Sequence, residues 1–223
     1  MHQKLFHREK QNEMRRFFLD NITSLGSTRN FKKNSIITIE GTDFVAIVTE
    51  GKIKQTLYSS QGISKLLYIL QPGEIIGELD YFGGGKSDIT SIAMTDGSIS
   101  IVKREELEKA LIKNTEIYRY FLYSASRKYR IIMLQMSSMC FNDSLGRIAK
   151  AILRLSAQQG KEIGDKIVID ISLTHQDLAE LVGCSRVTIT RGLNKLKEEK
   201  IIDIQKKKII IKNQDILNSL ILE

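Results

Sequence analysis

The sequence has one proline, two cysteines and no tryptophan among its 223 residues. Cys140 and Cys184 lie far apart, and neither belongs to a Cys-x-x-Cys motif or to a Cys/His spacing that would build a zinc or iron–sulfur site. We therefore predict no metal site and two free thiols in a reducing compartment. No uninterrupted apolar run exceeds five residues, and the first ten residues have no apolar core. These absences argue against a membrane span and a signal peptide, and they predict a cytoplasmic protein.

Arrangements that would indicate an enzyme are also missing. The sequence contains no recognisable Ser/His/Asp, Cys/His or paired-carboxylate pattern, and its three histidines are scattered. The segment 85–87, Gly-Lys-Ser, ends like a phosphate-binding loop, but Asp80 stands where that loop requires its first glycine. We therefore predict no catalytic residues.

Positive charge is abundant and unevenly distributed. Lys and Arg number 34 against 26 Asp and Glu, which gives a net charge of +8 and favours an acidic partner such as nucleic acid. Residues 184–212 include nine Lys or Arg and three acidic residues, so most of the excess positive charge lies near the C-terminus.

Between residues 34 and 102, short runs rich in Ile, Val, Leu and Thr alternate with turn residues. The turns are marked by Gly41, Gly51, Gly62, Pro72-Gly73, Gly83 to Gly85 and Asp96-Gly97. A spacing of roughly ten residues predicts an antiparallel sandwich or barrel. Its clearest strands are residues 52–58, 65–70 and 98–102.

From residue 105 to about residue 138 no Gly or Pro interrupts a run of good helix formers, which predicts one long helix. Its apolar residues recur at intervals of three and four, as in a helix that pairs with another helix. The candidate dimer positions are Ile117, Phe121, Ile131, Ile132, Leu134, Met136 and Met139, with Met133 in the same stripe. The alternative is a helix packed on its own β-domain.

The C-terminal third has the pattern of two helices joined by a sharp turn. Asn142 or Asp143 could cap a helix through residue 158, and residues 161–173 alternate like a hairpin. Thr174, with Asp177 three residues later, predicts the start of a short helix over residues 175–182. Gly183 ends that helix, a second one runs from residue 185 to about 199, and residues 201–211 form a strand pair like a wing.

The second helix carries the residues that suit DNA recognition. Ile189, Leu193 and Leu196 form one narrow buried stripe. The candidate base contacts on the exposed first turns are Arg186, Val187, Thr190 and Arg191, since arginine can hydrogen-bond guanine O6 and N7 together. The candidate phosphate contacts are Ser185, Thr188, Lys206, Lys207 and Lys208. The alternative is a solvated helix with ordinary surface arginines.

These motifs resemble the CRP/FNR family of bacterial regulators over nearly the whole chain. The matching segments are residues 178–186 (LAELVGCSR), 188–191 (TITR), 72–74 (PGE), 77–82 (GELDYF) and 146–149 (GRIA). The resemblance implies an α+β fold with an N-terminal antiparallel β-roll like a cyclic-nucleotide-binding domain (1–112), a long dimerisation helix (113–140) and a winged helix-turn-helix (141–223).

The resemblance also implies a homodimer that binds double-stranded DNA as an inverted repeat and acts with RNA polymerase. A signal at the β-roll would change how the paired long helices sit, and so present or withdraw the recognition helices. Val187 departs from the family pattern, because members commonly have Glu there. Valine offers only apolar contact, for instance to a thymine methyl.

The effector is not identified by the sequence. Cyclic-nucleotide-binding relatives use a Glu for the ribose hydroxyl, which Glu78 matches, but their phosphate-binding Arg-Ser pair falls near Asp88 and Ile89 here. The sequence therefore argues against cyclic AMP or GMP, and also against a nucleotide receptor whose output is not transcription. A candidate pocket for a hydrophobic or aromatic ligand comprises Glu78, Leu79, Ile132 and Met133. Haem ligation, and oxidant sensing by Cys184, stay open as alternatives.

Overall fold

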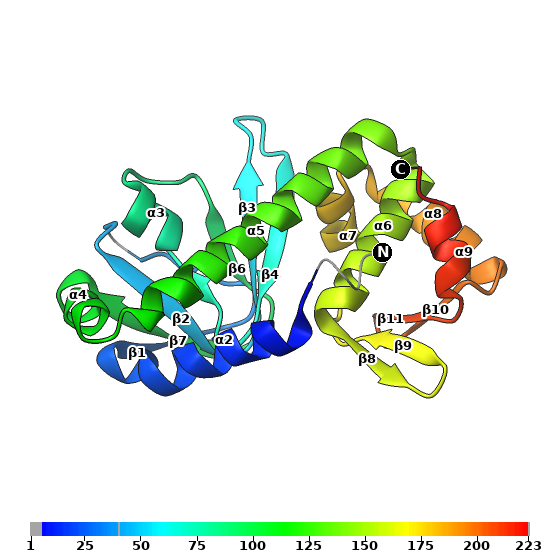
Figure 1. Cartoon of the computed structure of the whole chain (residues 1–223). Helices are drawn as coiled ribbons and strands as arrows, with labels where there is room; N and C mark the ends of the chain where they lie inside the picture. Colours follow the sequence, from blue (N-terminus) through cyan, green and yellow to red (C-terminus); the bar gives the residue numbers. More distant parts are fainter. Residues whose placement is uncertain (1–5, 40, 223) are drawn as a thin grey trace. The chain divides into compact units, whose positions relative to one another are not determined.

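The computed structural model describes residues 6–39 and 41–222, which form two compact units (Figure 1). The β unit comprises residues 9–131, and the helix-turn-helix unit comprises residues 132–222 with residues 6–8. No helix among the described residues is long and apolar enough to cross a bilayer.

The described part of the β unit contains two antiparallel sheets and four helices. Its elements are α2 (Arg8–Asn21), the 3-10 turn η1 (Thr23–Leu25), β1 (Ser27–Phe31), β2 (Phe44–Glu50), β3 (Ile53–Tyr58), β4 (Ser64–Leu70), β5 (Ile75–Ile76), α3 (Glu78–Gly83), β6 (Thr90–Ala93), β7 (Gly97–Lys103), α4 (Arg104–Lys113) and the first part of α5 (Glu116–Phe141). One sheet has the order β1-β7-β2-β5, and the other has the order β4-β3-β6. The predicted antiparallel β-domain is confirmed, and its three clearest strands correspond to β3, β4 and β7 within one residue at each end.

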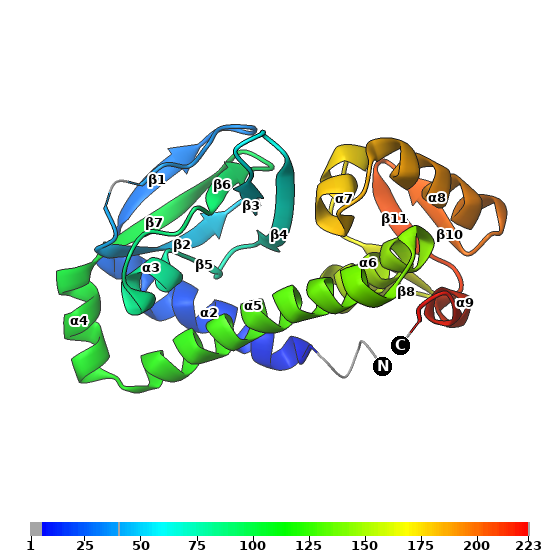
Figure 2. The ribbon, with the colours of Figure 1, turned by 90° about the horizontal axis from the view of Figure 1, so that it is seen from above.

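Alternation along β2 builds the core of this unit. Val45 and Ile47 face a cluster that α2, α4 and α5 complete, whereas Ala46 and Val48 face a second cluster between the sheets. Figure 2 shows α2 and the first half of α5 on the same side of the strands. Both sides of β2 are therefore buried, which explains its uninterrupted apolar sequence.

The helix predicted as one piece from residue 105 is divided into α4 and α5. The chain is extended at Asn114, with φ −139° and ψ 97°, between the two helices. The Asn114 side-chain oxygen accepts a hydrogen bond of 3.0 Å from the backbone N–H of Glu116, as in an Asx turn. A short polar side chain thus ends the run without a glycine or proline.

Helix α5 carries two neighbouring apolar stripes that the sequence pattern did not separate. Ile117 and Phe121 lie in the core of the β unit, where the Phe121 ring centre is 5.2 Å from that of Phe18. Ile131 is also buried, and Ile132 and Leu134 are half-buried. The exposed stripe consists of Tyr118, Leu122, Tyr129, Met133, Met136 and Met139. The predicted dimer positions are therefore divided, because Ile117, Phe121 and Ile131 pack within their own chain.

The helix-turn-helix unit follows the predicted order. Its elements are α6 (Ser144–Gln159), β8 (Gly160–Ile163), β9 (Lys166–Ile169), α7 (His175–Val182), α8 (Arg186–Glu198), β10 (Ile202–Gln205), β11 (Lys208–Ile211) and α9 (Gln214–Ser219). Asp143 caps α6 by accepting a hydrogen bond from the N–H of Gly146. The strands form one antiparallel sheet, β10-β11-β9-β8, so the β10–β11 hairpin extends from the sheet that supports it.

Candidate nucleic-acid interface and β-unit pocket

The turn between α7 and α8 is fixed by local hydrogen bonds. Thr174 and Asp177 form a capping box, in which Thr174 Oγ1 accepts from the N–H of Asp177 and Asp177 Oδ2 accepts from the N–H of Thr174, each at 3.0 Å. Gly183 ends α7 in the left-handed region at φ 76°, where a side chain would be strained. Both features were predicted, and together they set the angle at which α8 leaves the turn.

Helix α8 exposes the face expected to read DNA. Ser185 caps it by accepting a hydrogen bond of 3.0 Å from the N–H of Thr188. Ile189, Leu193 and Leu196 are completely or almost completely buried, as the stripe predicted. Arg186, Val187 and Arg191 are exposed, Val187 at 58%. Such an exposed apolar side chain between two arginines has no role in the core of its own chain.

Thr190 is placed differently from its three companions. It is half-buried, and its hydroxyl donates to the backbone oxygen of Arg186 at 3.0 Å and lies 2.9 Å from Nδ1 of His175. Through its contact with His175, Thr190 thus connects α8 to α7. This contact with His175 could not be read from the sequence, because it joins residues fifteen positions apart.

Ser185 and Thr188 lie together at the N-terminus of α8. Their hydroxyl oxygens are 2.8 Å apart, and Ser185 precedes the first turn while Thr188 lies within it, where backbone N–H groups point outward. A helix N-terminus with two hydroxyls suits a phosphate oxygen. The predicted pair is therefore brought to one place.

The three lysines of the wing do not share one environment. Lys206 and Lys207 form the exposed turn between β10 and β11, whereas Lys208 belongs to β11 and its Nζ lies 2.6 Å from Asp170 Oδ1. Asp170 also pairs with Lys161, and hydrogen bonds from Lys161 and Lys208 hold its pKa well below the usual range. Lys208 is thus partly neutralised within the protein, and Lys206 and Lys207 carry the accessible charge of the wing.

The recognition helix and the wing border a common hollow. Its volume is about 490 Å³, and Arg186 of α8 and Lys207 of the wing both line it, together with His175 of α7. Two cations from different elements therefore face one concave surface.

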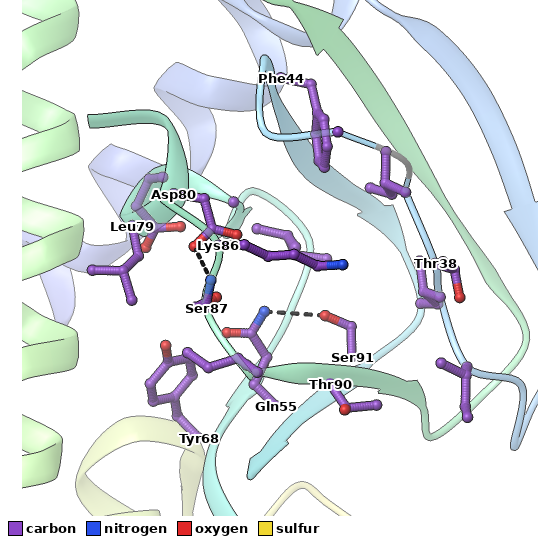
Figure 3. Close-up of a pocket in the computed structure, with 18 residues that line it drawn as sticks. Thr38, Phe44, Gln55, Tyr68, Leu79, Asp80, Lys86, Ser87, Thr90 and Ser91 are labelled. Atoms are coloured by element: carbon purple, nitrogen blue, oxygen red, sulfur yellow. Dashed lines mark hydrogen bonds between the residues drawn. The ribbon is translucent and has the colours of Figure 1, made fainter. Parts of the chain in front are cut away.

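The β unit contains a second pocket of about 220 Å³, between the sheet edge and α3 (Figure 3). Gln55, Tyr68, Lys86, Ser91 and Thr38 contribute polar groups to its lining. Of the predicted effector residues, Glu78 and Leu79 line it. Ile132 and Met133 are not among the described residues that line it.

Two buried acids of the β unit are paired with cations from α5, which the sequence pattern missed. Glu78 forms an ion pair with Lys128, and Glu74 Oε1 lies 2.8 Å from Arg127 Nη1 and 3.0 Å from Arg15 Nη2. Burial alone would raise the pKa of Glu74, but Arg127 and Arg15 hold that pKa below its ordinary value. Because the partners are about fifty residues apart in sequence, only the fold brings them together.

Comparison with known families finds matches over both units. Residues 28–114 match the cyclic nucleotide-binding domain, and residues 146–220 match the Crp-like helix-turn-helix domain.

Similar whole proteins are also found. The chain is 30% identical to the global nitrogen regulator of Nostoc sp. over 185 residues, which cover 81% of this chain and 83% of the relative. It is 29% identical to the anaerobic regulatory protein of Bacillus subtilis over 200 residues, covering 88% and 84%. The solved structure of CprK complexed with OCPA is 28% identical and superposes with a TM-score of 0.72, covering 91% of this chain and 92% of that chain.

Proposed function

This chain belongs to the CRP/FNR family of transcription regulators, and from that membership we propose that it binds an inverted DNA repeat as a homodimer. Its place in the family makes it a DNA-binding regulator with a helix-turn-helix, and not an enzyme. The dimer, the form of the DNA site and the contacting residues are what the proposal adds.

The observation that carries the proposal is the exposed face of α8. Arg186, Val187 and Arg191 project away from the buried stripe, and neither arginine has an ion-pair partner within the described part of the chain. An unpaired guanidinium can grip guanine O6 and N7 with two hydrogen bonds, and Val187 can contact a thymine methyl. We assign base recognition to these three residues, with Thr190 holding α8 in position.

We assign phosphate contacts to two places, the start of α8 and the tip of the wing. Ser185 and Thr188 offer hydroxyls and backbone N–H groups at the start of α8, and Lys206 and Lys207 offer charge at the tip of the wing. Lys208 is given a smaller role because Asp170, which also pairs with Lys161, partly neutralises it. Contacts of this kind position a protein on DNA without reading its sequence.

The dimer is assigned to the exposed stripe of α5. Tyr118, Leu122, Tyr129, Met136 and Met139 of that stripe, together with exposed Ala125 and half-buried Ile132, follow one another at alternating intervals of four and three residues. That spacing is the a/d pattern of two paired helices, and most of these side chains are exposed in the single chain. A second copy would cover them.

The family also supports two further parts of the proposal. We assign RNA polymerase as the protein partner at the promoter, and we place the regulatory signal at the pocket of the β unit. The DNA contacts above do not depend on either assignment.

The test is selection of bound sequences from a randomised duplex library by the purified protein, without added small molecules and at near-physiological salt. We expect an inverted repeat whose half-sites lie about one helical turn apart. A folded Arg186→Ala/Arg191→Ala variant serves as the control and should enrich no repeat. Failure of the wild type to enrich any sequence, with or without small-molecule extract of the source cells, would contradict the proposal.

A further inference from the structure

Lys128 of α5 ends at a buried site in the β unit. Its Nζ forms an ion pair with Glu78 of α3, donates a hydrogen bond of 2.7 Å to the backbone oxygen of Ile75 in β5, and lies 5.2 Å from the centre of the Tyr68 ring in β4. The side chains of Lys128 and Glu78 are each only 8% exposed. One ammonium from α5 therefore contacts three separate elements of the β unit.

This ammonium pairs with a residue that lines the pocket. Glu78 and Tyr68 both line the pocket, although Lys128 itself does not. A ligand hydroxyl that hydrogen-bonds Glu78 has to compete with a buried ion pair, and displacing Lys128 would leave a charge without its partner in a site shielded from water. The pocket is thus poorly suited to a ligand that is recognised through a sugar diol at Glu78.

The same ammonium fixes the part of α5 that bears the proposed dimer stripe. Tyr129, the next residue, is exposed on that stripe, and Arg127, the preceding residue, pairs with buried Glu74. Arg127 and Lys128 therefore attach one face of α5 to buried acids of the β unit, while the neighbouring face, which includes Tyr129, remains exposed.

We propose that Lys128 acts as an internal substitute for an effector. By occupying Glu78 it holds α5 in the orientation that allows DNA binding without a ligand, and it excludes sugar diols from that carboxylate. This inference rests on the proposed function, because it concerns how the DNA-binding dimer is switched.

The test compares Glu78→Gln, Lys128→Met and the double variant Glu78→Gln/Lys128→Met with the wild type. The control is Arg119→Met, which removes an exposed cation from the same helix. Three quantities are measured without ligand: affinity for the selected repeat, the melting temperature, and amide hydrogen exchange of residues 116–131.

We expect each single variant to lose about tenfold in DNA affinity, within the usual range for coupling between two sites, and to exchange faster in residues 116–131. The double variant should recover melting temperature, because no unpaired charge remains, but neither DNA affinity nor slow exchange. The control should match the wild type in all three. Calorimetry with cyclic AMP on the wild type should show no binding.

Three results would overturn the inference. The first is single variants that keep wild-type affinity and exchange. The second is a double variant that recovers affinity together with melting temperature, because the pair would then serve stability alone. The third is cyclic AMP binding to the wild type. If the wild type bound no DNA sequence, the proposed function would fail, whereas unchanged exchange in the variants would refute the anchoring itself.

Discussion

Nδ1 of His175, the first residue of α7, lies 2.9 Å from Oγ1 of Thr190 on α8. This contact joins the two helices of the motif beside the surface assigned to DNA. Replacing Thr190 with Val keeps the shape of the side chain and removes the hydroxyl. We expect unfolding free energy to fall by about 1 kcal/mol, the usual net value of one or two hydrogen bonds. Urea denaturation measures this change. The comparison variant is Thr188→Val, which removes a hydroxyl at the exposed start of the same helix.

Arg186 and Arg191 should behave as readers of sequence. Alanine at either position should weaken binding to the selected repeat by about 1–3 kcal/mol and relax preference at one base position in each half-site. Competition titrations with single-base variants of the site measure both effects. Lys195→Ala, on the exposed side of the last turns of α8, is the control. Equal losses for every base variant would assign these arginines to phosphate contact instead.

Lys206 and Lys207 should act on all DNA sequences alike. Changing both to Gln should lower affinity for specific and random duplexes by the same factor, and should reduce the slope of log K against log salt by about 2 if each contacts one phosphate. Lys208→Gln should change that slope less, since Asp170 pairs with Lys208. A shift in base preference in the double variant would contradict the assignment.

Glu74 should be a determinant of acid stability. Its pKa is lowered on folding from 4.5, because Arg127 and Arg15 outweigh the effect of burial. A lowered pKa contributes stability that is present above the unfolded value and is lost as pH falls through the folded value. Glu74→Gln should therefore reduce stability by about 3–5 kcal/mol at neutral pH, as expected when one partner of a buried pair is removed. The variant should also flatten the loss of stability below pH 4.5.

The control for Glu74 is Glu106→Gln. It removes an exposed pair with Lys109 and should change stability by less than about 1 kcal/mol. Similar losses for both variants would refute the role of the buried cluster.

Adjacent residues of α5 should give opposite outcomes. Phe121→Ala should cost about 3–5 kcal/mol of stability, because the ring packs between Phe18 and Phe82. Leu122, which is 70% exposed, should tolerate Ala in the fold, but Leu122→Glu should dissociate the dimer. Sedimentation equilibrium and thermal unfolding separate the two effects. A Leu122→Glu protein that remains dimeric would exclude this stripe from the interface.

Local rules account for the parts of the molecule that were predicted well. The start of α7 at Thr174, its end at Gly183 and the start of α8 near residue 185 each depend on residues within a few positions. The buried stripe of α8 was also readable, because only one apolar stripe runs along that helix. The candidate recognition surface was assigned to the opposite face.

Non-local contacts explain what the sequence did not reveal. Helix α5 carries two apolar stripes one residue apart, and periodicity does not say whether Phe121 or Leu122 faces the chain's own core. The pairing of Lys128 with Glu78 and of Lys208 with Asp170 joins residues 50 and 38 positions apart. The division at Asn114 was local, but Asn is compatible with a helix interior unless its side chain caps the next turn.

The backbone of the wing turn is strained at both of its lysines. Lys206 and Lys207 both have positive φ, 49° and 62°, a conformation that costs non-glycine residues about 1–2 kcal/mol each. Asn-Gly would form the same turn with less strain. A sequence chosen only for folding would therefore not place lysine twice at this tip. Variants that relax the turn should accumulate in a screen for thermal stability. They should be removed in a screen for promoter occupancy, so the two screens would select different residues at these positions.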